Sequence, residues 1–267
     1  MQLELISQQP AHVTHPVPIL FVHGAWHGAW CWVPHFLPYF AQQGYAVHAL
    51  SFRAHGTSAG RERLRGKRIA QYAEDLAQVA AQLGQPPIII AHSMGTLVAQ
   101  KYLEKHTAPA TVLLAPVPPQ GVIATTLRIA GRHLGPFLHA NATLSLYPLI
   151  ATNKLARDAF FSADMPEDQV TTYQQQMQDE AYLAFLDMII FNLSRPKQVQ
   201  QRNPTMPLLV LGGADDHIFP PREVQATAKK YGTTAEIFPH MAHDMMLETG
   251  WQTVADKIIG WLGEMNK

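Results

Sequence analysis

Short, unbroken apolar runs alternate along the chain with stretches whose apolar residues recur every three or four positions. Apolar runs of this length are typical of strands buried on both faces, and the recurrent spacing is typical of amphipathic helices. The alternation predicts an α/β fold in which a mostly parallel sheet carries helices on both faces, with short edge strands within residues 1–16. The predicted internal strands are residues 18–22, 46–51, 88–91, 110–115, 207–212 and 235–238.

The regular pattern is interrupted from about Gln120 to Asn203. This segment shows no convincing strand, and its helical stretches are residues 125–133, 166–177 and 179–191. The sequence therefore predicts an α/β core of residues 1–119 and 204–267, with residues 120–203 inserted as a helical cap. Ligands of open α/β sheets bind beyond the carboxyl ends of the strands, so a cap placed there would influence substrate choice. A packed extension with no role in substrate choice is the alternative.

Ser93 lies at the junction between an apolar strand and a helical pattern, in the segment Ala91-His92-Ser93-Met94-Gly95. A serine between small residues at a tight strand-to-helix turn is typical of a nucleophile elbow, which lifts the hydroxyl above the sheet. The usual first glycine is replaced here by Ala91, which is still small but tolerates fewer backbone angles. A serine that merely caps the helix N-terminus is the alternative interpretation.

Two later loops supply an acid and a base in the order that this architecture requires. Asp215 and Asp216 follow one apolar strand, and His240 and His243 follow the next. A serine hydroxyl needs a base to take its proton, and the base needs an acid to orient it. The pattern therefore predicts a Ser-Asp-His triad with Ser93, although the spacing alone leaves both the acid and the base open. A turn aspartate and a surface histidine are the structural alternatives.

Composition excludes several other functions. Apolar residues make up 47% of the 267 residues, and the 20 basic residues balance the 20 acidic ones, so nothing points to nucleic acid. The single cysteine, Cys31, allows no internal disulfide. His23 and His27 have no third ligand at a suitable spacing, so no metal site is expected, and no glycine fingerprint predicts a cofactor. The lack of a signal peptide and of a membrane-spanning run predicts a cytoplasmic protein with no integral membrane segment.

Over essentially its whole length the chain resembles the α/β-hydrolase superfamily. The segment His23-Gly24-Ala25-Trp26-His27-Gly28-Ala29-Trp30-Cys31-Trp32 is similar to the His-Gly segment of the plant methyl esterase and hydroxynitrile lyase group. The segment Arg53-Ala54-His55-Gly56-Thr57-Ser58 resembles a signature of monoacylglycerol lipases and lysophospholipase-like hydrolases. The resemblance implies a serine hydrolase with an α/β-hydrolase fold.

The resemblance also implies a role for particular residues. A Gly-x-x-Asp-x-x-x-Pro motif that starts at Gly213 implies that Asp216 is the acid, with Asp215 as the second choice. The small-residue turn before His243 favours it over His240 as the base. The oxyanion would be held by the backbone N–H groups of Ala25 and Met94. The candidate substrate-binding residues are Trp26, which is as well explained as core, and His92.

We therefore expect an esterase or lipase-like enzyme that forms an acyl-enzyme on Ser93 and needs no cofactor. The expected partner is a small-molecule ester that is uncharged and moderately lipophilic, and the sequence leaves the oligomeric state open. Hydroxynitrile lyases related to the plant esterases carry a threonine at the position of Gly24 and a lysine at that of Asp244, so this activity ranks low. A carbon–carbon bond hydrolase on the same triad and a non-catalytic ligand receptor are also compatible with the sequence.

Overall fold

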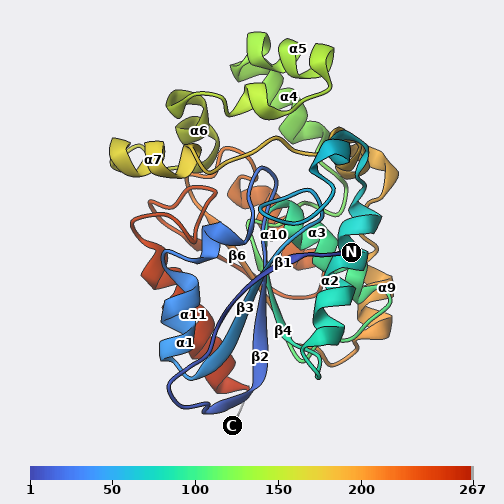
Figure 1. The fold of residues 1–267 in the computed structure, drawn as a ribbon, viewed down its shortest axis with the longest axis vertical. Coiled ribbons are helices and arrows are strands. Elements are labelled where there is room, and N and C mark those ends of the chain that lie inside the picture. Colours follow the sequence, from blue (N-terminus) through green and yellow to red (C-terminus); the bar gives the residue numbers. More distant parts are fainter. Residues whose placement is uncertain (266–267) are drawn as a thin grey trace.

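The computed structural model describes residues 1–265, and within them one seven-stranded sheet forms the centre of the molecule (Figure 1). Its strand order is β1-β3-β2-β4-β5-β6-β7, and all neighbouring strands are parallel except the edge pair of β1 and β3. The strands are β1 (Glu4–Gln8), β2 (His15–Val22), β3 (Tyr45–Ser51), β4 (Ile88–His92), β5 (Thr111–Leu114), β6 (Leu208–Gly213) and β7 (Ala235–Phe238). The predicted mostly parallel sheet is confirmed.

Helices cover both faces of the sheet, as the unbroken apolar strands require. Helices α1 (Phe36–Gln42) and α11 (Trp251–Glu264) lie on one face, and α2 (Ile69–Gln82), α3 (Met94–Leu103) and α10 (Pro221–Lys230) lie on the other (Figure 1). Alternate residues of β2 feed the two cores: Ile19 and Phe21 face the first layer, and Leu20 and Val22 face the second. All four side chains are fully buried, which confirms a strand covered on both faces.

The segment between β5 and β6 is helical, and α4 to α7 lie together beyond one end of the sheet (Figure 1). Helix α9, although within the predicted cap, packs beside the core helix α3. The helices of this segment are α4 (Ile123–Arg132), α5 (Leu134–Thr143), α6 (Asn153–Phe160), α7 (Glu167–Gln174), α8 (Tyr182–Leu186) and α9 (Pro196–Arg202).

The sequence pattern missed α5, α6 and α9. Each has at most ten residues, so its apolar spacing repeats too few times to stand out, and Gly135 and Pro136 weaken the signal of α5 further. The helix predicted over residues 179–191 starts at Tyr182 as α8 and continues as a π-helical turn, Asp187–Phe191.

Buried polar groups attach this helical segment to the core at several places, and Gln178 and Glu248 mark two of them. At the first, the side chain of Gln178 accepts a hydrogen bond from Gly56 N and donates one to Ala54 O. At the second, the buried Glu248 carboxylate accepts hydrogen bonds from the backbone N–H and the hydroxyl of Ser162. Because breaking either attachment would leave buried polar groups without partners, both places hold the segment firmly against the sheet edge.

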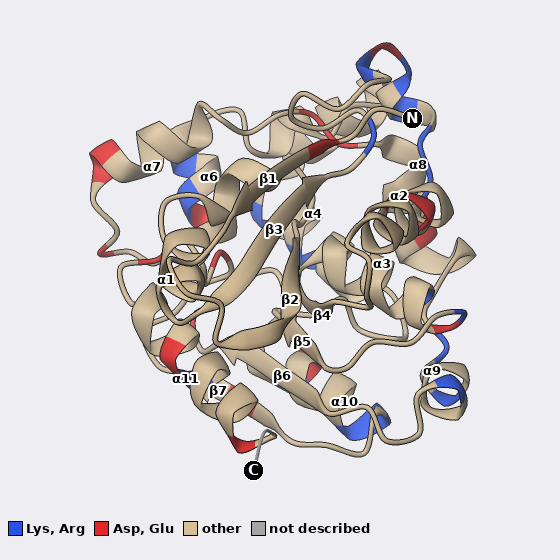
Figure 2. Ribbon diagram, turned by 60° about the horizontal axis from the view of Figure 1, so that its bottom comes forward, with Lys and Arg blue, Asp and Glu red and all other residues tan. Residues whose placement is uncertain are grey.

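Charged residues are scattered over the outer helices and loops, while β2 to β7 are largely free of them (Figure 2). Neither sign of charge dominates a whole side of the molecule in this view, in keeping with the balanced composition. Among the described residues, no helix combines the length and the apolar character that crossing a membrane demands.

Candidate active site

Ser93 occupies a strained turn between β4 and α3. Its backbone angles are φ 51° and ψ −123°, a region that residues other than glycine seldom adopt. The turn also brings backbones close together, because a Cβ on Gly95 would clash with the carbonyl of His23 and lie 2.7 Å from that of Val22. Ala91 is part of the regular strand β4 and has no positive φ, which explains why alanine is accommodated there.

Ser93, His243 and Asp216 form a continuous hydrogen-bonded chain. The Ser93 Oγ lies 2.8 Å from His243 Nε2, and His243 Nδ1 lies 2.8 Å from Asp216 Oδ2. The other oxygen of Asp216 accepts hydrogen bonds from the backbone N–H groups of Ile218 (2.7 Å) and Phe219 (2.8 Å), which hold the carboxylate in place. A carboxylate can accept but not donate, so His243 donates from Nδ1 and its Nε2 is free to accept the serine proton.

The two competing candidates from the sequence lie apart from this chain. Asp215 is exposed, and its backbone N–H donates to Met241 O. His240 is also exposed and has a positive φ of 52° at the turn that precedes the histidine loop. The structure thus brings together Asp216 and His243, and leaves Asp215 and His240 at the surface.

The loop after β2 lies directly against the serine. A Cβ on Gly24 would be 2.9 Å from the Cβ of Ser93, so the backbone of Gly24 passes close to the serine side chain. His23 donates from Nδ1 to Gly24 O (2.7 Å), and its Nε2 accepts from Phe52 N (3.1 Å). Both nitrogens are therefore used by a neutral ring, in agreement with burial and the nearby His55, which lower the pKa of His23 well below its usual range.

Comparison with known proteins agrees with this architecture. A family model described as "Alpha/beta hydrolase family" matches residues 19–257. The chain belongs to the alpha/beta hydrolase family. This membership confirms the resemblance seen in the sequence and, with the sheet topology, the predicted fold class.

Individual relatives of this hydrolase are more distant. Methylesterase 3 of Arabidopsis thaliana is 33% identical over 81 residues, which is 30% of the chain and 30% of that protein. A monoacylglycerol lipase from Paleococcus ferrophilus superimposes with a TM-score of 0.70 at 19% identity, covering 98% of both chains. The esterase EaEST from Exiguobacterium antarcticum gives a TM-score of 0.75 at 14% identity, covering 98% of the chain and 95% of the esterase. At such identities these two structures show a shared fold.

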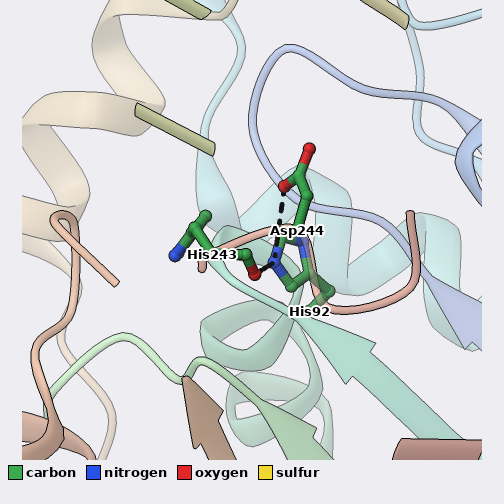
Figure 3. A group of neighbouring side chains, drawn as sticks. All are labelled: His92, His243 and Asp244. Carbon is green, nitrogen blue, oxygen red and sulfur yellow. Dashed lines mark hydrogen bonds and ion pairs between the residues drawn. The ribbon is translucent and has the colours of Figure 1, made fainter. Parts of the chain in front are cut away.

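His92 packs behind His243 and is 1% exposed. It lies between the backbone carbonyl of His243 and the side chain of Asp244 (Figure 3). Its Nε2 donates to His243 O (2.9 Å), whereas its Nδ1 makes no hydrogen bond within the described residues. Burial, together with His243, lowers the pKa of His92 to about 3, so the ring is neutral. The predicted contact of His92 with substrate stays a prediction.

His92, His243 and Asp244 are also close enough to be considered as metal ligands, since their potential ligand atoms lie within 4.8 Å of one another. Both nitrogens of His243 are already used by Asp216 and Ser93, and one nitrogen of His92 carries a proton for a backbone carbonyl. A metal ion would have to displace these hydrogen bonds. The group therefore fits the hydrogen-bonded chain better than a metal centre.

Trp26 has a positive φ of 64° and is held in place by the helical segment. Its indole Nε1 donates to Leu146 O (3.2 Å), and its ring lies edge-on to Phe160, with the ring centroids 5.6 Å apart. Trp26 also lines a small pocket between α4, α6 and the loop after β6, and the exposed surface of this pocket is mostly apolar. Two lining residues, Ala159 and Ile218, directly precede Phe160 and Phe219 in the chain, and the rings of these two phenylalanines contact the ring of His243.

Two buried carboxylates of the site carry no motif that reveals their role. Asp244 directly follows His243, but its partner His27 is 217 positions away in the chain. Glu180 lies in the helical segment, where no motif marks it, yet it accepts hydrogen bonds from Trp26 N and the hydroxyl of Tyr72. An acidic residue that belongs to no motif gives no sign that it is buried, and its partners emerge only with the fold.

Proposed function

We propose that this hydrolase cleaves carboxylic esters of small to medium lipophilic compounds through an acyl-enzyme on Ser93, with His243 as the general base and Asp216 as its orienting acid. The observation that carries the proposal is the unbroken hydrogen-bonded chain from Ser93 Oγ through His243 to Asp216, with 2.8 Å at each of its two links. Its three residues come from three separate loops. A structural hydrogen bond alone would not need a strained serine at its end.

In the proposed mechanism, His243 takes the proton of Ser93 as the hydroxyl oxygen attacks the ester carbonyl. His243 then protonates the leaving alcohol, and an acyl-enzyme remains on Ser93. Water adds to this intermediate with the roles of His243 reversed, and releases the carboxylic acid. Asp216 keeps the Nδ1 proton in place and stabilises the imidazolium that forms in each step.

The oxyanion of the tetrahedral intermediate is assigned to the backbone N–H groups of Met94 and Ala25. Met94 follows the strained serine and begins α3, where the helix N-terminus favours negative charge. Ala25 follows Gly24, whose missing side chain leaves the approach to Ser93 open. Each such donor contributes roughly 3 kcal/mol to transition-state stabilisation.

The proposed preference for lipophilic acyl groups rests on the mostly apolar pocket that Trp26 lines. The helical segment supplies most of its wall. Apolar side chains such as Leu149, Ile150 and Leu155 outnumber the charged residues and histidines that also line it. We propose that residues 120–203 act as the cap that selects the substrate. The names of the relatives, a methylesterase, a monoacylglycerol lipase and an esterase, all denote enzymes that act on esters.

The test compares the wild type with Ser93→Ala on p-nitrophenyl esters of increasing acyl length. We expect kcat/KM to rise from acetate toward medium chains, and Ser93→Ala to lower it at least about 1,000-fold. Substantial ester turnover by Ser93→Ala would contradict the proposal. Cleavage of cyanohydrins or of a carbon–carbon bond in preference to every ester would favour a lyase or a carbon–carbon bond hydrolase. Failure of Ser93 to react with a fluorophosphonate probe would favour a receptor.

A further inference from the structure

A second histidine–carboxylate pair lies beside the proposed triad, and the triad chemistry leaves it without a role. His27 Nε2 is 2.9 Å from Asp244 Oδ2, and both side chains are completely buried. Such a pair is costly to desolvate, so hydrophobic residues of the same volume would often be no less stable. A contribution to stability therefore does not account well for its position, in contact with the loop that follows His23-Gly24.

The other nitrogen of His27 fixes the backbone of that loop. His27 Nδ1 donates to Ala25 O (2.7 Å), while the N–H of the same peptide unit, that of Trp26, donates to Glu180 Oε2 (3.2 Å). The peptide between Ala25 and Trp26 is thus held from both sides by buried groups. This matters because Trp26 has a φ of 64°, a conformation that a tryptophan keeps only when its surroundings impose it.

The preceding peptide unit carries the proposed oxyanion donor. Its carbonyl, Gly24 O, is held by His23, and the described chain contains no cis peptide bond. In a trans peptide the N–H points away from the C=O, so the direction of Ala25 N–H follows from that of Gly24 O. The two peptide units share the Cα of Ala25, so a displacement of the Ala25–Trp26 peptide would also shift the unit that carries this N–H.

The protonation of His27 and Asp244 is consistent with a fixed support for the backbone at Ala25. Nδ1 of His27 faces a carbonyl and Nε2 faces a carboxylate, so a ring with a proton on each nitrogen satisfies both. Burial alone would lower the pKa of His27, but the charge and hydrogen bond of Asp244 outweigh it and raise that pKa. Burial likewise acts to raise the pKa of Asp244, and His27 outweighs it and lowers that pKa.

We propose that His27 and Asp244 are positioning residues that fix the Ala25 N–H group for the oxyanion, an inference that rests on the proposed esterase function. The pair links this loop to the histidine loop, because Asp244 directly follows His243 in the chain. Neither side chain touches the reacting atoms. Their loss is expected to weaken stabilisation of the oxyanion and to leave Ser93 and His243 in place.

The test uses an ester and its thiono analogue, in which sulfur replaces the carbonyl oxygen. Sulfur accepts hydrogen bonds weakly, so the ratio of kcat/KM for the two substrates reports on the oxyanion donors. We expect Asp244→Ala to lower kcat for the oxygen ester about 30-fold at an unchanged KM and to lower the ratio about 10-fold. Asp244→Asn can still donate to a neutral His27, so it should recover most of both losses.

The double variant His27→Phe/Asp244→Leu leaves no unpaired buried charge and replaces Asp244→Ala if the latter does not fold. An unchanged oxo/thiono ratio in either folded variant would overturn the proposal, and so would an Asp244→Asn variant as impaired as Asp244→Ala. Ser93→Ala is measured alongside. If Ser93→Ala keeps its esterase activity, the proposed function fails. If Ser93→Ala is inactive but the Asp244 variants keep the oxo/thiono ratio of the wild type, only the positioning role fails.

Discussion

Two buried histidine–aspartate pairs lie side by side in this member of the alpha/beta hydrolase family, and each pair has a different environment. His243 faces Asp216 on one side and the Ser93 hydroxyl on the other, a group that can give up its proton. His27 faces Asp244 on one side and the carbonyl of Ala25 on the other, which has no proton to give. The first arrangement suits a proton that moves during each turnover, and the second suits a charge that stays in place.

The two pairs meet on one loop, because His243 and Asp244 are consecutive. His243 points toward the serine, while Asp244 points toward the loop after β2. A short segment after β7 therefore carries both the proposed base and, through His27, the proposed support of the oxyanion donor. A histidine next to an aspartate therefore has no role that can be assigned from residue types alone. The partner of its second imidazole nitrogen, a hydroxyl for His243 and a backbone carbonyl for His27, decides whether it is positioned for acid–base chemistry or for structural support.

The largest expected effect comes from breaking the acid–base pair. Asp216→Asn should lower kcat about 10,000-fold, because an amide in place of the carboxylate no longer holds the Nδ1 proton or stabilises the imidazolium. Steady-state hydrolysis of p-nitrophenyl butyrate measures the loss. Asp215→Asn is the matched control at the exposed neighbour, and its kcat should stay within about twofold of the wild type. Similar losses in both variants would refute the assignment of Asp216.

A smaller effect is expected from disturbing the oxyanion side. The Cβ of a Gly24→Ala variant would lie 2.9 Å from both Ser93 Cβ and His92 Nδ1, so the serine or the loop must shift. We expect kcat/KM to fall about 100-fold, the loss typical of a small misplacement of reacting groups. Gly131→Ala is the control, since its Cβ would have no atom within 4 Å. Its activity should match the wild type, and a fully active Gly24→Ala would contradict the close packing described here.

The smallest expected effect concerns His92, which contacts both pairs. Its pKa is about 3 in the folded protein, against 6.5 for the free side chain, so below pH 6.5 the unfolded chain binds a proton that the folded one does not. Stability from this group is therefore complete above pH 6.5 and is lost as the pH falls. Between pH 6.0 and 5.0, His92→Gln should reduce the slope of the unfolding free energy by about 1 kcal/mol per pH unit.

Urea unfolding at several pH values measures this slope in the wild type and in His92→Gln. Other buried histidines titrate in both proteins, so the difference between the two slopes isolates His92. The glutamine amide can still donate to His243 O, which keeps the backbone of the histidine loop supported. If the unfolding free energy has the same pH slope in both proteins, His92 gains its proton in the folded protein as readily as in the unfolded chain, and the assignment of a neutral ring is wrong.

The core of this fold was predictable because its strands are local signals. Ser93, Asp216 and His243 each follow an apolar strand, and parallel strands bring their carboxyl ends to one edge. The choice between Asp215 and Asp216 required a family resemblance, because neighbouring residues share the same strand and differ only in the direction of their side chains. The structure supplied that direction through the backbone N–H groups of Ile218 and Phe219.

The remainder of the site depends on contacts between distant segments. The pairing of His27 with Asp244 and the buried position of Glu180 arise from packing, which no local spacing encodes. The wall of the pocket depends on how α4 and α6 lie against the loop after β6, and the sequence pattern missed α6 altogether. Short helices in an insertion are stabilised mainly by tertiary contacts, so their own periodicity carries little information.

The most direct test of the account is the mass of the protein during turnover. The enzyme is mixed with excess p-nitrophenyl butyrate, quenched in acid within milliseconds to seconds, and analysed by intact-protein and peptide mass spectrometry. We expect a butyryl group on Ser93 that appears with the first turnover and is absent in Ser93→Ala. Steady ester hydrolysis with Ser93 unmodified at every time point, and no reaction of Ser93 with a fluorophosphonate, would contradict it.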